Sequence, residues 1–119
     1  MAATLTSTGF QDATDYKVIS CTAIDNTTAQ TNPTNTSGTL RSVIINSTNS
    51  SDNVTLHILD TTDTALTQLA IKGKASSIKT MSIPTGYAFT ELKFWVSKLS
   101  TEDDTTSFAG DVDVHLVCS

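Results

Sequence analysis

Residues 111–118 (DVDVHLVC) decide the fold class, because apolar and polar side chains alternate through the stretch. The side chains on the apolar face are Val112, Val114, Leu116 and Cys118. The opposite face carries Asp111, Asp113, His115 and Val117. A period of two is that of a β-strand with one buried face and one face open to water. We therefore predict a half-buried strand here.

Further strand candidates precede this stretch, separated by turns rich in Asn, Asp, Ser, Thr, Pro and Gly. Residues 53–60 (NVTLHILD) repeat the alternation, with Val54, Leu56 and Ile58 facing the core. The other candidates are residues 17–24, 39–46, 66–72, 76–83 and 92–98. Short strands at regular spacing are typical of a sandwich or a barrel. We predict an all-β fold, an antiparallel, jelly-roll-like β-sandwich of about seven to eight strands.

Several of these strand candidates carry apolar side chains on both faces. Residues 39–46 have Leu40 and Ile44 on one face and Val43 and Ile45 on the other. In residues 92–98, Trp95 points away from the face that enters the core. A sheet with one face in water would keep that face polar. We therefore expect the second face to be covered by the N-terminal segment or by another subunit.

The chain of 119 residues has the size of one domain. Residues 1–16 are polar and show no period, with Leu5, Phe10 and Tyr16 scattered among them. We predict an extended N-terminal arm over residues 1–16 and a single sandwich domain over residues 17–119.

Composition and charge argue against several classes of partner. The formal net charge is −5, with only seven Lys and Arg, whereas nucleic-acid binders carry a clustered basic face. The nearest approach to a cluster is Lys72, Lys74 and Lys79, which we interpret as edge-strand lysines that oppose aggregation. No apolar run approaches the roughly 20 residues of a membrane helix, and the start resembles no signal peptide. We expect no nucleic-acid or membrane partner.

The sequence offers little catalytic chemistry. His57 and His115 both fall on outward strand positions, where a solvated side chain is the expected state. Nucleophilic catalysis needs a Ser or Cys beside a His and an orienting carboxylate, and no Gly-x-Ser-x-Gly elbow occurs. We expect the protein not to be an enzyme.

Metal and disulfide sites are also weakly indicated. Acidic residues cluster at Glu102, Asp103 and Asp104, and again at Asp60 and Asp63, but neither group fits a calcium-loop pattern. The two cysteines, Cys21 and Cys118, are too few for a disulfide scaffold, and we expect them to be reduced core residues. We expect no metal and no cofactor.

From Gly38 onward the chain resembles small bacteriophage virion proteins of β-sandwich type. The segments that carry the resemblance are residues 38–46 (GTLRSVIIN), 54–60 (VTLHILD), 83–89 (IPTGYAF), 92–96 (LKFWV) and 111–117 (DVDVHLV). The resemblance implies a capsid decoration (cement) protein, or a neck or tail accessory protein, that assembles in the host cytoplasm. It implies a homo-oligomer, with a trimer favoured, bound to the major capsid protein or other virion proteins. Such families supply no catalytic residues.

Two other functions remain open from the sequence. One is a receptor- or carbohydrate-binding module of a spike or tail tip, and the other is a small hydrolase built on His57 and His115. The residues expected to contact other subunits or partners are Leu5, Phe10, Tyr16, Tyr87 and Trp95.

Overall fold

The computed structural model describes residues 4–10, 13–24, 26, 30–31, 37–60, 69–99 and 105–119. These residues form β-strands, turns and loops, with no helix that could cross a membrane. The strands are β1 (Thr4–Phe10), β2 (Ala13–Thr22), β3 (Gln30–Thr31), β4 (Gly38–Asn49), β5 (Val54–Asp60), β6 (Leu69–Gly73), β7 (Ile78–Phe89), β8 (Leu92–Ser97) and β9 (Asp111–Cys118).

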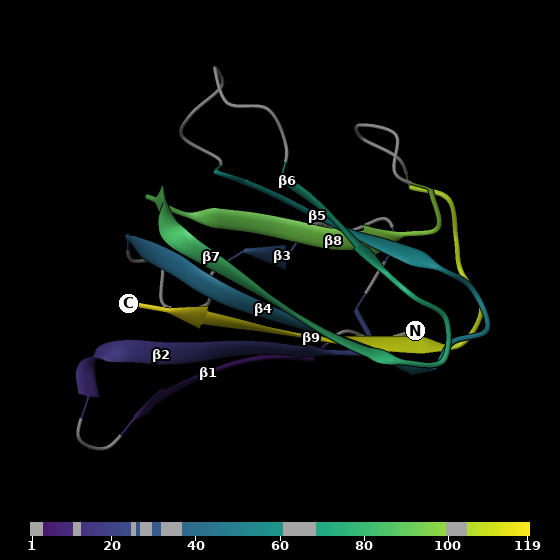
Figure 1. The fold of residues 1–119 in the computed structure, drawn as a ribbon, viewed down its shortest axis with the longest axis horizontal. Helices are drawn as coiled ribbons and strands as arrows, with labels where there is room; N and C mark the ends of the chain where they lie inside the picture. The colour runs from purple at the N-terminus through teal and green to yellow at the C-terminus, as the bar shows by residue number, and fades with distance from the viewer. Residues whose placement is uncertain are drawn as a thin grey trace.

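The strands form two antiparallel sheets that pack face to face, as Figure 1 shows. The five-stranded sheet has the order β1-β2-β9-β4-β7, and the four-stranded sheet has the order β3-β8-β5-β6. If β2 to β9 are counted from one to eight, the sheets read 1-8-3-6 and 2-7-4-5, with β1 added at one edge. This is the strand order of a jelly roll. The predicted antiparallel, jelly-roll-like sandwich is confirmed.

The core lies between the two sheets and is built from alternate residues of the central strands. On β9 the apolar residues Val112, Val114, Leu116 and Cys118 are all fully buried, as the alternation in residues 111–118 predicts. The facing layer comes mainly from β5 and β8, with Leu56, Ile58, Leu92, Phe94 and Val96 also at 0% exposure. Burying one such side chain contributes about 1.5–3 kcal/mol. The hydrophobic layer therefore holds the two sheets together.

Strand β4 departs from simple alternation, and the predicted assignment of its faces is wrong. Leu40, Val43 and Ile45 are all buried in the core, while Ile44 points outward and is half-buried. The register with both neighbouring strands shifts between Leu40 and Ser42, which places Arg41 at an irregularity. A bulge inserts a residue and so changes which face the following side chains occupy. The two-faced apolar pattern of β4 thus reflects a bulge.

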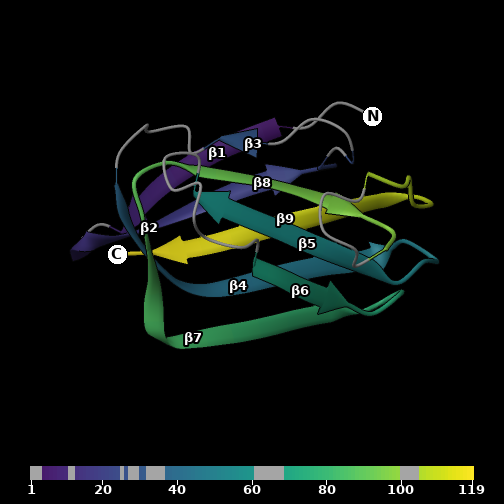
Figure 2. The same cartoon turned by 90° about the horizontal axis from the view of Figure 1, so that it is seen from above.

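The N-terminal segment belongs to the five-stranded sheet of its own chain. Strand β1 pairs antiparallel with β2, from Thr4 opposite Thr22 to Phe10 opposite Ala13 (Figures 1 and 2). Within the expected arm over residues 1–16, the described residues 4–10 and 13–16 are extended, as expected, but they belong to strands of this sheet. Residues 4–9 (TLTSTG) lack an apolar period because Thr and Ser occupy most positions. Thr nevertheless suits an edge strand, where packing demands are low.

We expect Gly110→Ala to destabilise the fold. Gly110 has a φ of +73°, and a Cβ atom there would collide with the carbonyl oxygen of Asn49. The left-handed conformation and the collision together should lower the free energy of unfolding by about 2–4 kcal/mol. Urea denaturation measures this, with Ser107→Ala, an exposed change in the same loop, as the control. Equal stability of the two variants would contradict the described turn.

Candidate functional site

The outer face of the five-stranded sheet carries the side chains that alternate with the core residues of its central strands. Residues that point outward from β2, β9 and β4 are half-buried: Val18, Ser20, Ser42, Ile44, Asn46, Asp113, His115 and Val117. The face mixes small polar groups with single apolar side chains.

Strand β7 forms one edge of this sheet and is mostly exposed. Residues 78–82 pair with β4 on one side, and no described strand pairs with them on the other. Ile78 is 59% exposed and Met81 is 37% exposed, which is unusual for large apolar side chains in one strand. An edge of this kind presents unpaired backbone groups to a further strand.

The second part of β7 turns away from this edge. Figure 2 shows the strand bending sharply before it leads into β8. Residues 83–86 separate its two stretches of pairing with β4, and Gly86 has a φ of +74° within them. A Cβ atom at Gly86 would collide with the side chain of Thr39. The Pro84–Gly86 segment is therefore a corner that divides the β7 edge into residues 78–82 and residues 87–89.

His115 forms a hydrogen-bonded pair with a serine on the outer face. Its Nδ1 lies 2.7 Å from Ser20 Oγ across the β2–β9 pair. The nearest carboxylate along the strand, Asp113, accepts a hydrogen bond from the backbone N–H of Ala23 through Oδ1 at 2.9 Å. No described hydrogen bond joins His115 to a carboxylate, so the orienting third member of a triad is missing among these residues.

His57 lies on the outer face of the four-stranded sheet but is fully buried, contrary to the expected solvated state. Its Nε2 lies 2.7 Å from Ser97 Oγ, and that hydroxyl donates to the carbonyl oxygen of Leu99 at 2.9 Å. With its proton directed to Leu99, the hydroxyl accepts from the imidazole N–H. A histidine that acts as general base would instead accept the proton of the serine hydroxyl. The hydrogen bond between His57 and Ser97 has the opposite direction, so the pair is structural.

Trp95, one of the residues expected to contact a partner, is packed inside the chain. Its indole stacks on the His57 ring, with ring centroids 4.9 Å apart and planes 9° from parallel. Only 6% of the residue is exposed. Trp95 lies at an outward strand position, as expected, but this part of the outer face is buried, together with Thr55, His57 and Ser97.

The other predicted contact residues are placed differently. Tyr87 is half-buried and packs against the core cluster. Leu5, Phe10 and Tyr16 lie in β1 and β2, and their side chains are outside the part that the structure describes. The structure therefore does not bring these five residues together as one described surface.

Metal and disulfide chemistry find no support among the described residues. No group of three or more His, Cys, Asp or Glu side chains in these ranges is arranged to hold a metal ion. Asp60 instead accepts backbone hydrogen bonds from Thr90 and Glu91 at 2.9 and 3.4 Å. The acidic residues 63 and 102–104 lie outside the described ranges. Cys21 and Cys118 are buried, and their positions along the β2–β9 pair differ by four residues, too far for a disulfide.

Lysines gather around a pocket at one end of the sandwich, a feature that the sequence indicates only in part. The pocket has a volume of about 500 Å³. It is lined by Asn53, Val54, Thr55, Lys72, Gly73, Lys74, Lys79, Lys98 and Leu99. Four of the seven basic residues of the chain thus meet at one place. Three of these lysines stand close together in the sequence, but Lys98 joins them only through the strand pairing.

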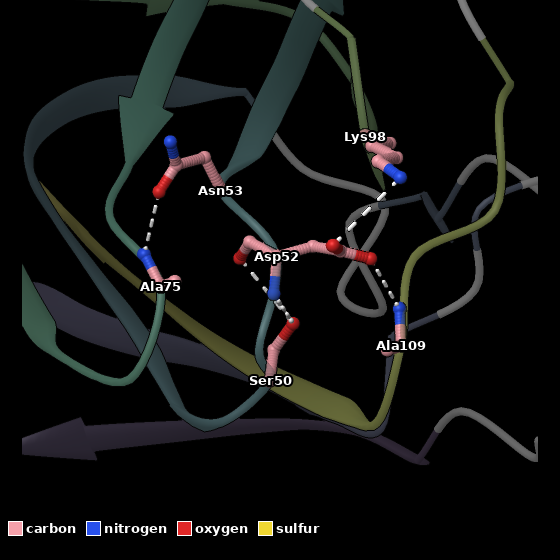
Figure 3. Close-up of polar contacts among 6 residues, drawn as sticks. All are labelled: Ser50, Asp52, Asn53, Ala75, Lys98 and Ala109. Carbon is pink, nitrogen blue, oxygen red and sulfur yellow. Dashed lines mark hydrogen bonds and ion pairs between the residues drawn. The ribbon is translucent and has the colours of Figure 1, made fainter.

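The wall of this pocket is held by hydrogen bonds between turns, which Figure 3 draws. Asn53 Oδ1 accepts from the backbone N–H of Ala75 at 2.9 Å, which ties the start of β5 to the β6–β7 turn. Asp52 Oδ2 accepts from the N–H of Ala109 at 2.9 Å, and its Oδ1 lies 3.7 Å from Lys98 Nζ. Three connections far apart in the sequence are therefore joined at the pocket.

Comparisons with known proteins found no matching family model, no matching curated protein and no matching solved structure.

We expect Trp95→Ala to lower stability strongly, because it removes a buried ring stacked on His57. The loss should be about 3–5 kcal/mol in the free energy of unfolding, measured by chemical denaturation. Trp95→Phe, which keeps an aromatic ring on His57, serves as the matched variant and should lose less than half as much. If Trp95→Ala left stability unchanged, the indole would belong to a surface and the described packing would be wrong.

Proposed function

We propose that this protein is a non-enzymatic virion structural protein that self-associates and binds a capsid or tail lattice, with capsid decoration as its role. The observation that carries the proposal is a jelly-roll sandwich with an exposed, partly apolar edge strand, β7. The bacteriophage assignment comes from the sequence resemblance, and the strand order agrees with it because viral capsid domains are often jelly rolls.

A fold by itself does not specify function, so the surfaces carry the rest of the argument. A carbohydrate-binding module of the kind considered above needs an open aromatic platform, and Trp95 is buried at 6% exposure. A hydrolase needs an activated nucleophile, and the His57–Ser97 pair is buried with the opposite hydrogen-bond polarity. These two observations favour the structural role over both alternatives.

Self-association is proposed to run through the outer edge of β7. Residues 78–82 offer backbone groups to a strand of another copy, and Ile78 and Met81 add apolar area on opposite faces of that strand. Strand addition combines backbone hydrogen bonds with burial of such side chains. Lys79 is the charged residue in this stretch, so the edge has limited protection against pairing.

Ile78→Glu is expected to weaken self-association of the full chain. A carboxylate at the edge must lose water when a second strand pairs there, so we expect at least a tenfold weaker oligomer in analytical ultracentrifugation. Thr105→Glu, an exposed position outside β7, adds the same charge and should leave the oligomer unchanged. A wild-type chain that stays monomeric at micromolar concentrations would refute self-association.

The virion assignment needs its own measurement. We expect an antibody against the full chain to label purified particles from producing cells regularly, on the shell or on the tail, in immunogold electron microscopy. Particles that lack the protein, with the chain left entirely in the soluble fraction, would contradict the proposed role.

A further inference from the structure

We propose that the lysine-lined pocket is a binding site for a compact anion that carries two or more linked phosphate groups. The site goes beyond the proposed structural role, and it shares Lys79 with the outer edge of β7 through which self-association is proposed. Its residues are Asn53, Thr55, Lys72, Lys74, Lys79 and Lys98.

The fold concentrates positive charge at this pocket in a chain whose formal net charge is −5. Lys72 and Lys74 come from the end of β6, Lys79 from β7 and Lys98 from the end of β8. The four ammonium groups repel one another, so a pocket that gathers them favours a ligand of negative charge. Protection of an edge against aggregation requires a charge on an edge strand. Edge protection does not explain Lys98, because Lys98 directly follows β8, which lies between β3 and β5 in its sheet.

The charged and amide side chains that line the pocket are hydrogen-bond donors. Each lysine ammonium donates and never accepts. Asn53 uses its Oδ1 to accept from Ala75, which leaves the Nδ2 amide as a further donor. The neighbouring carboxylate of Asp52 is occupied by Ala109 N–H and by Lys98, at 2.9 and 3.7 Å. A ligand rich in acceptors and negative charge complements this arrangement.

The residue types select phosphate among anions. Arginine holds carboxylates and phosphates through two parallel hydrogen bonds, whereas the cations among the described lining residues are lysines, each of which acts as a point charge. Such a site favours the anion with the highest charge density. The described lining residues include no aromatic side chain on which a nucleobase would stack. A volume of about 500 Å³ lies in the range of small-ligand sites.

The backbone that carries the lysines is fixed before any ligand binds. The carbonyl oxygen of Lys74 accepts from Ser47 Oγ at 2.6 Å and from Ser77 Oγ at 2.8 Å. Ser47 is itself 1% exposed, so this anchor is buried. A site held in position loses less entropy on binding than one that must be ordered.

Isothermal titration calorimetry of the full chain with inorganic tripolyphosphate tests the site. We expect measurable binding that weakens with salt, and about fivefold weaker affinity for Lys74→Gln and for Lys79→Gln. Lys93→Gln removes the same charge from an exposed position outside the pocket and should bind like the wild type. Asp52→Asn removes the competing carboxylate and should bind about twofold more tightly. Circular dichroism checks that each variant is folded.

Three outcomes would overturn the proposal. Absence of binding at millimolar tripolyphosphate would remove the site. An equal loss of tripolyphosphate affinity in Lys93→Gln and Lys79→Gln would show that the anion is attracted to surface lysines in general. Equal affinity for citrate, a compact tricarboxylate, would contradict the assignment to phosphate.

Discussion

The antiparallel pairing of β9 between β2 and β4 is the interaction on which the rest of the structure depends. This pairing joins β9, near the C-terminus, to β2, near the N-terminus, and to the long strand β4. Segments far apart in the sequence thereby become neighbours. The same strand places Val112, Val114, Leu116 and Cys118 in the core with no exposure. Without β9 the five-stranded sheet would divide in two and the β5–β8 layer would lose its facing surface. Loop-closure entropy opposes such long-range pairing, and burial of the apolar face offsets it.

The exposed features follow from how the chain departs from regular strands around this centre. The irregularity at Arg41 directs Leu40, Val43 and Ile45 inward together, which leaves Ile44 on the outer face. The corner within β7 divides its pairing with β4 into two stretches, and the chain then enters β8 of the other sheet (Figure 2). The turns at the far end, held by Asp52 and Asn53, collect the lysines around one pocket (Figure 3). Edge and pocket are adjacent features of one frame, and they share Lys79 of β7.

The sequence predicts the strands with one buried face well, because alternation directly reports that geometry. Residues 111–118 fold as predicted, and residues 53–60 contain the predicted strand with Val54, Leu56 and Ile58 in the core, although Thr55 and His57 on its other face are also buried. The jelly-roll-like sandwich follows from strand spacing. The faces of β4 could not be predicted, since a one-residue bulge has no clear signature in a run of apolar residues. Burial of His57 and Trp95 depends on what covers an outer sheet face, which is not local information. Lys98 joins the other pocket lysines only through register, so the sequence shows three of the four.

Hydrogen–deuterium exchange of the full chain, resolved to single strands, tests the central place of β9 most directly. If β9 holds the sandwich together, its amides should exchange only when the whole domain unfolds, in the slowest class with those of β4 and β5. The amides at the outer edge of β7 should exchange much faster. Exchange of β9 at the rate of that edge, while β4 and β5 stay protected, would contradict the account.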